Sequence, residues 1–97
     1  MAKLALYVKL VPKKGKEAQV EAFLKQGAEM SKSEAGTVHW FGLKEDDTAY
    51  SVFDTFETEA ARDAHLNGEI AKALMASAEE LFSEPPQIHK ITILGDK

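Results

Sequence analysis

Cysteine is absent from this sequence. Without a thiol the chain can form no disulfide, no thiolate metal site and no thioether-linked haem, and it can hold no cysteine nucleophile. An excess of positive charge is also missing, since 12 Lys and Arg residues face 16 Asp and Glu residues and the net charge is −4. This balance argues against nucleic acid or an anionic membrane surface as a partner, because a basic excess steers binding to both.

Long apolar runs are missing as well. No stretch approaches the roughly 20 apolar residues that a helix needs to span a bilayer, and the first ten residues alternate too regularly for a signal peptide. We therefore expect a cytoplasmic protein without a membrane partner. The chain has 97 residues, of which 44% are hydrophobic and 29% are charged, as in a folded domain rather than a disordered chain. We interpret residues 1–97 as a single domain.

The hydrophobic periodicity predicts an alternation of strands and helices. Segments with apolar residues at both odd and even positions predict strands at residues 3–11, 37–44, 49–57 and 87–94. Apolar stripes at helical spacing predict helices at residues 16–33, 59–66 and 69–83, the last two separated at Gly68. The order β-α-β-β-α-β, with a split second helix, is typical of the ferredoxin-like fold. We expect an α+β domain with a four-stranded antiparallel sheet.

The uncovered face of this sheet points to a partner. Two right-handed crossovers place both helical regions on one face of the sheet and leave the other face bare. Because the strands have apolar residues at both odd and even positions, the bare face is expected to carry apolar side chains. An exposed apolar face of this kind indicates an interaction with a partner. Two sheets packed face to face would provide this interaction, so the sequence predicts a homodimer.

His65 is the main candidate for a functional side chain. Ala61, His65 and Gly68 share one stripe of the short helix, so small neighbours let this helix lie close to the sheet and leave the imidazole protruding into a pocket. A neutral imidazole suits proton abstraction near pH 7, whereas a purely structural histidine would hydrogen-bond the sheet edge instead. Asp54 shares a strand face with apolar residues and must be paired, hydrogen-bonded or at a rim. Arg62 lies off the stripe and is expected to stay solvated.

Aromatic and sulfur-containing side chains could form a cavity for a flat ligand beside His65. Taken singly, each of them is more often part of the core or of a dimer interface. These candidates for substrate binding are Trp40, Tyr7, Tyr50, Phe53 and Phe56, with Met75 and Phe82 as a possible adaptable lid. The other histidines, His39 and His89, share no ligand spacing with His65, so no metal site is expected.

Several motifs together resemble the antibiotic biosynthesis monooxygenase (ABM) family of dimeric α+β barrels, over almost the whole chain. They are Val11-Pro-x-x-Gly15, Glu34-Ala-Gly36, Phe53-Asp-Thr-Phe-Glu57, Ala64-His-Leu-Asn-Gly68 and Pro85-Pro86. The resemblance implies a homodimer whose sheets form a shared barrel, with a pocket between sheet and helices in each subunit. It also implies chemistry without a cofactor, since characterised members oxidise quinols or polycyclic phenols with O2 and no metal or flavin. Other members degrade haem, but Leu74-Met75 occupies the stretch of their axial histidine.

These observations lead to two alternative functions. The first is a cofactor-independent monooxygenase that oxidises a small aromatic quinol or phenol with O2, with His65 as general base or hydrogen-bond donor. The second is a non-catalytic dimer of the same fold that binds a small molecule or serves a stress response. Consumption of O2 with a panel of quinols distinguishes the two.

Overall fold

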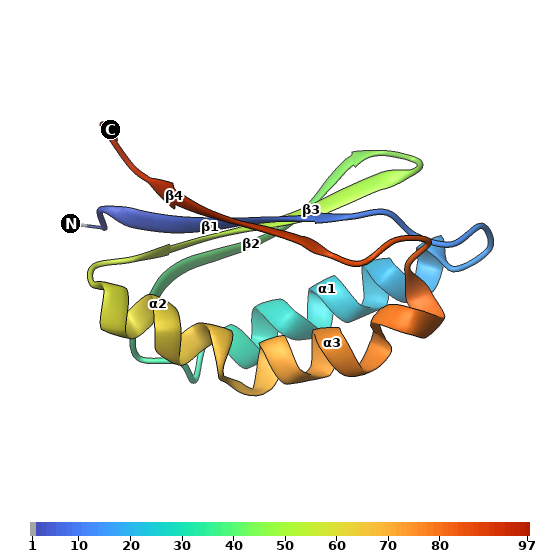
Figure 1. Ribbon diagram of the computed structural model, residues 1–97, viewed down its shortest axis with the longest axis horizontal. Helices are drawn as coiled ribbons and strands as arrows, with labels where there is room; N and C mark the ends of the chain where they lie inside the picture. The colour runs from blue at the N-terminus through green and yellow to red at the C-terminus, as the bar shows by residue number, and fades with distance from the viewer. Residues whose placement is uncertain (1) are drawn as a thin grey trace.

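The computed structural model describes residues 2–97, which form one four-stranded sheet and three helices (Figure 1). Each element lies within a few residues of its predicted bounds. The strands are β1 (Leu4–Leu10), β2 (Thr37–Asp46), β3 (Ala49–Phe56) and β4 (Gln87–Thr92), and the helices are α1 (Glu17–Ser31), α2 (Glu59–Leu66) and α3 (Glu69–Leu81). The second helical region is therefore split at Gly68, as the sequence predicts.

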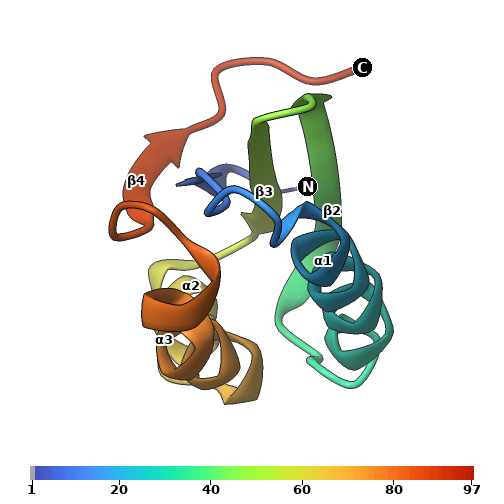
Figure 2. The same ribbon diagram turned by 90° about the vertical axis from the view of Figure 1, so that its right-hand side faces the viewer.

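The sheet has the strand order β2-β3-β1-β4, and each neighbouring pair is antiparallel. All three helices lie on the same side of the sheet, and α1 runs alongside α3 (Figures 1 and 2). This arrangement confirms the predicted ferredoxin-like α+β fold. The sheet of a single chain is open, so the barrel of the resembled family would need a second subunit.

The hydrophobic core lies between the sheet and the pair α1 and α3. Alternate residues of the central strands point toward the helices, and the helices present their apolar stripes in return. Its buried members are Val8, Leu10, Val20, Leu24, Tyr50, Val52, Leu74, Leu81 and Phe82. Gly27 lets α1 approach β2 closely, because a Cβ there would lie 2.8 Å from the ring of Trp40.

The short helix α2 packs against the sheet in a different way. It begins at the N-cap Thr58, whose Oγ1 accepts a hydrogen bond from the backbone N–H of Ala61 at 3.1 Å. Its buried residues are Arg62 and His65. The expectation that Arg62 stays solvated is wrong. Residues three apart share a helix face, so Arg62 lies beside His65 and its long side chain reaches under the sheet.

The guanidinium of Arg62 ends against the backbone of the two strands above it. Its Nη1 donates to the carbonyl oxygens of Ala5 in β1 and Ile91 in β4, at 3.3 and 3.4 Å. These two residues are paired across the sheet. The side chain is 7% exposed, so the charge is buried against main-chain oxygens rather than against water.

The second face of the sheet carries no helix among the described residues (Figure 1). Phe41 and Leu43 of β2 are 48% and 39% exposed there, and Ile91 of β4 is 37% exposed. Tyr7 and Phe53, which pair across β1 and β3, are half-buried on the same face. The predicted apolar and uncovered face is therefore present in the single chain.

Candidate functional site

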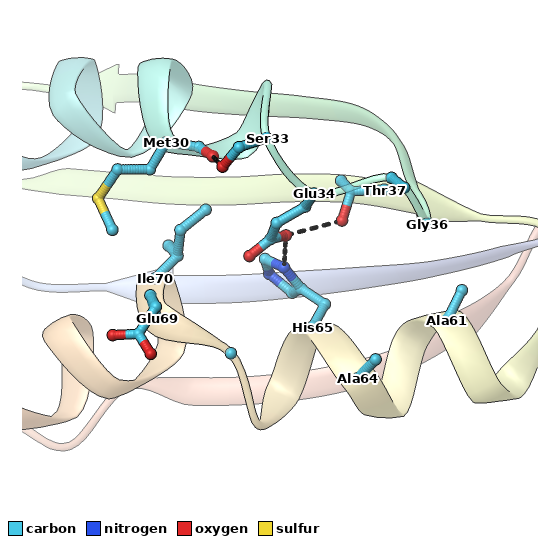
Figure 3. Close-up of a pocket in the computed structure, with 12 residues that line it drawn as sticks. Met30, Ser33, Glu34, Gly36, Thr37, Ala61, Ala64, His65, Glu69 and Ile70 are labelled. Carbon is cyan, nitrogen blue, oxygen red and sulfur yellow. Dashed lines mark hydrogen bonds and ion pairs between the residues drawn. The ribbon is translucent and has the colours of Figure 1, made fainter.

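A cavity of about 490 Å³ opens beside His65. It lies between the C-terminal end of α1, the loop that follows it, α2 and the start of α3 (Figure 3). Its walls are mostly small or apolar, from Met30, Ala35, Gly36, Ala61, Ala64 and Ile70. The pocket expected beside His65 is present, and it opens mainly at the level of the helices, with Thr37 of β2 in its wall. Asp54, Phe56 and His65 are buried.

Two glycines bring the walls of this cavity together. A Cβ at Gly36 would lie 2.9 Å from the Cβ of Ala61, so only glycine lets the α1–β2 loop lie this close to α2. A Cβ at Gly68 would lie 3.2 Å from Oε2 of Glu34. The close approach of loop and helix places the Glu34 carboxylate directly opposite His65 (Figure 3).

The imidazole of His65 lies between two carboxylates that come from distant parts of the chain. Its Nδ1 lies 2.5 Å from Oε1 of Glu34 in the α1–β2 loop, and its Nε2 lies 2.8 Å from Oδ2 of Asp54 in β3. Oε1 of Glu34 also accepts a hydrogen bond from Oγ1 of Thr37 at 2.8 Å. The His65 ring packs against Phe56, with 5.4 Å between ring centroids. We call Glu34, Asp54 and His65 the triad.

The members of the triad differ in their access to solvent and in the quality of their contacts. The side chain of Asp54 is 1% exposed, whereas that of Glu34 is 21% exposed and lines the cavity. The contact between Nε2 and Asp54 is a short ion pair that lacks the direction of a hydrogen bond. Neither oxygen of Asp54 accepts a well-directed hydrogen bond from the described residues. Asp54 is thus held by charge, and the sequence-based inference that it must be paired is confirmed.

The surroundings of His65 favour its charged form. Burial by itself lowers the pKa of the imidazole, but the contacts with Asp54 and Glu34 outweigh it, so the pKa of His65 lies above its ordinary value. The proton inventory agrees, because a neutral imidazole has one N–H and only the imidazolium can donate toward two carboxylates at once. The ionised triad then carries one excess negative charge. Both ring nitrogens of His65 are occupied by protein groups.

Of the side chains predicted to form the site, only His65 lines this cavity. Its ring is buried rather than solvated. None of the predicted substrate-binding residues lines the same cavity. Trp40, Tyr50 and Phe56 lie on the helix-covered face, where Tyr50 and Phe56 are fully buried. Tyr7 and Phe53 lie on the opposite face of the sheet.

Met75 and Phe82 belong to a different part of the surface. They line a separate hollow of about 350 Å³ beside Pro85 and Pro86, where Met75 is 57% exposed and Phe82 is buried. Tyr50 lines a third hollow of about 230 Å³ and donates a hydrogen bond to Glu21. A binding role for these aromatic and methionine side chains stays a prediction.

Glu34 is the residue of this site that sequence reasoning missed. It follows the end of α1 in a short polar loop. The motif Glu34-Ala-Gly36 contributed to the family resemblance, but no functional role was predicted for Glu34 itself. The available signal was Gly36, since a glycine between two elements can mark a close approach of the backbone. Its partner in that approach, Ala61, is 25 positions away and could not be identified from spacing.

Within residues 2–97, no group of three or more His, Cys, Asp and Glu side chains is suited to hold a metal ion. In the same part of the chain, no helix has the length and hydropathy needed to cross a bilayer. The cytoplasmic location stays a prediction.

Comparison with known proteins places the chain in a family. Residues 4–77, well over half of the chain, match the family model described as antibiotic biosynthesis monooxygenase. The chain belongs to this family. The predicted resemblance is thereby confirmed. No curated protein matches the sequence significantly.

Solved structures agree with the assignment of the fold. NE2512 from Nitrosomonas europaea, a protein of unknown function, is 48% identical with a TM-score of 0.96, over all of this chain and 94% of that one. Rv0793 from Mycobacterium tuberculosis is 17% identical with a TM-score of 0.85, over 98% of each chain. A proposed antibiotic biosynthesis monooxygenase from N. europaea is also 17% identical, with a TM-score of 0.84 over 96% of this chain and 91% of that one. The last two likenesses show the fold alone.

Proposed function

We propose that this ABM-family protein is a cofactor-independent monooxygenase that oxidises a small aromatic quinol or phenol with O2. The observation that carries the proposal is the triad, a buried imidazole between two carboxylates at the wall of a cavity of about 490 Å³. Cavities of this size suit small organic ligands. The apolar wall would hold the ring of the ligand, and the carboxylate edge would meet its hydroxyl group.

The chemistry needs only the substrate, O2 and a proton acceptor. Removal of the hydroxyl proton gives an electron-rich anion that O2 can oxidise. In the net reaction the aromatic substrate loses two hydrogens and gains one oxygen atom, while the second oxygen atom leaves as water. The substrate supplies all the electrons for this reduction of O2. The apolar walls would keep water away from the reactive anion.

Measurement of O2 uptake with a panel of phenols and naphthoquinols tests this proposal. We expect turnover by the wild type above the rate of uncatalysed oxidation. His65→Ala should reduce turnover about 10²–10⁴-fold, the usual effect of losing acid–base assistance. Glu29→Gln is the matched control, because Glu29 is exposed, pairs only with Lys32 among residues 2–97 and does not line the cavity. Ligand binding without O2 uptake by any phenol would support the non-catalytic alternative instead.

We also propose that the protein forms a homodimer through the uncovered sheet face. The support is the exposure of Phe41, Leu43 and Ile91 on a face that no helix of residues 2–97 covers. Burial of such a patch against a second copy would remove it from water, at roughly 25 cal/mol for each Å² of apolar surface. Light scattering should give twice the mass of one chain, and a stable monomer at micromolar concentration would contradict this proposal.

A further inference from the structure

We propose that Glu34, through its oxygen Oε2, is the group that takes the proton of the ligand. In this assignment His65 is a positioning residue rather than the base itself. The assignment deepens the proposed function, on which it rests, because a phenolic hydroxyl is the proton donor that the cavity would receive. The argument uses the contacts of the triad, the charges at the cavity wall and the space around Oε2.

The two ring nitrogens of His65 leave it no free position for a ligand. Nδ1 faces Glu34 and Nε2 faces Asp54, which is almost completely buried. A ligand in the cavity would therefore have to displace a carboxylate before it reached the imidazole. Glu34 and His65 both line the cavity, where the Glu34 carboxylate faces Nδ1 of His65 (Figure 3). Glu34 is the more exposed of the two carboxylates.

The two oxygens of Glu34 have different surroundings. Oε1 is held by Thr37 and His65, at 2.8 and 2.5 Å. Among the described residues, no hydrogen bond reaches Oε2, whereas Thr37 and His65 both contact Oε1. Oε2 lies close to Gly68, and both residues line the cavity. One oxygen is thus fixed in place, and the other is free to accept a hydrogen bond from a ligand. This is the arrangement expected of an oriented proton acceptor.

The charges around the cavity define the ligand that suits it. None of the described residues that line the cavity is a lysine or an arginine. Among the described lining residues, the basic side chain is His65, whose nitrogens face Glu34 and Asp54. A further carboxylate, Glu69, also lines the cavity and lies 3.8 Å from Nζ of Lys72. A ligand with its own carboxylate would meet the negative triad without a partner, whereas a neutral phenol would donate its O–H to Oε2. The excess negative charge of the triad is the charge that the transferred proton neutralises.

The proton step is simple to balance. The phenolic O–H bond breaks, the proton forms an O–H bond with Oε2 of Glu34, and the electron pair stays on the phenolate oxygen. Oε1 keeps its contacts with Thr37 and the imidazolium of His65 throughout. The charged pair of Asp54 and His65 holds Glu34 in position during the transfer.

Binding of two probes without O2 tests the assignment independently of turnover. The probes are 1-naphthol, which is neutral and donates a hydrogen bond, and 1-naphthoate, which is an anion of similar size. Isothermal titration calorimetry should show that the wild type and Glu29→Gln prefer 1-naphthol. In Glu34→Gln, the amide NH2 can take the place of Oε2 and donate toward the cavity. We expect the affinity ratio of 1-naphthoate to 1-naphthol to rise about tenfold or more.

A second variant keeps the charge of Glu34 but blocks its free oxygen. Gly68 has φ near −90°, which alanine tolerates, and a Cβ there would lie 3.2 Å from Oε2 and 3.3 Å from the backbone carbonyl oxygens of Ala64 and His65. Gly68→Ala should therefore weaken 1-naphthol binding while the chain stays folded in a thermal melt. In O2-uptake assays, Glu34→Gln should lower kcat about 10²–10⁴-fold, and Glu34→Asp should restore part of it.

The outcomes separate this assignment from the proposed function. If phenols are oxidised equally well by Glu34→Gln, the assignment is overturned and the proposed function stands. If no phenol consumes O2 but Glu34→Gln inverts the probe preference, the proposed function fails and Glu34 remains the acceptor that faces the ligand. Binding of neither probe by the wild type, or an unchanged preference in Glu34→Gln, would overturn the assignment.

Discussion

The two ends of the helix-covered sheet face are filled with opposite chemistry. Beneath α1 and α3 the buried side chains are almost all apolar, as at Val8, Leu10 and Val20. Beneath α2 they include Asp54, Arg62 and His65, all at most 8% exposed. Both ends use the same alternation of strand residues and the same layer of helices. They differ in whether burial removes hydrocarbon or charge from water.

This difference indicates what each end contributes. Burial of apolar side chains stabilises the fold by about 1.5–3 kcal/mol for each large residue. Burial of an ion pair costs several kcal/mol of desolvation for each ion. Replacement of such a pair by apolar residues of similar volume often leaves the stability unchanged or raises it. The buried charges therefore stabilise the fold less than apolar residues would at the same positions. This supports a chemical role for the charged end. The predictions below test this contrast between the two ends.

Removal of one partner from the charged end should have the largest effect on stability. Asp54→Ala leaves His65 with one carboxylate partner and creates a buried cavity beside its ring. We expect a loss of about 3–5 kcal/mol in the free energy of unfolding. Urea denaturation followed by circular dichroism measures it. A loss below about 1 kcal/mol would show that Asp54 is not held by this ion pair.

Truncation at the apolar end should come next. Leu10→Ala removes a side chain that is 0% exposed in the core, and we expect a loss of about 2–5 kcal/mol from lost burial and the resulting cavity. Because no charge is involved, the loss should be the same at every pH where the protein is folded. A clear pH dependence of this loss would contradict the division of the face into an apolar and a charged end.

The pH dependence of stability should distinguish the two ends more finely. Since contacts with Asp54 and Glu34 raise the pKa of His65 despite its burial, its contribution is fully present below the unfolded value near 6.5. That contribution is lost as the pH rises above 6.5 and through the folded pKa. The stability gap between wild type and His65→Gln should therefore narrow as the pH rises above about 6.5. The matched gap for Leu10→Ala should stay constant in the same denaturation series.

The smallest effect on the single chain is expected on the opposite face of the sheet. Phe41→Lys places a charge on an exposed position, and it should change the stability of the single chain by no more than about 0.5 kcal/mol. The same change should disrupt the proposed homodimer, which sedimentation velocity would show as a shift to the mass of one chain. If Phe41→Lys left the dimer intact, the interface would have to lie on a different surface of the protein.

Much of the fold was predictable from the sequence because it depends on local patterns. The alternation of apolar residues defined the strands, and Thr58 and Gly68 marked the start of α2 and its break from α3. The charged partner of Asp54 could be anticipated, since a carboxylate on an apolar strand face needs compensation. The motif around His65 also pointed correctly to the family. Each of these inferences uses residues that are close together in the chain.

The sequence by itself determined the elements, their order and the presence of one buried histidine. Only the tertiary structure decided which groups meet that histidine, because Glu34, Asp54 and His65 come from a loop, a strand and a helix that no spacing connects. It also decided that Arg62 is buried and that the cavity is lined by small residues rather than by aromatic ones. These outcomes depend on how closely α2 approaches the loop after α1, and that distance is set by contacts between Gly36 and Ala61 across the fold.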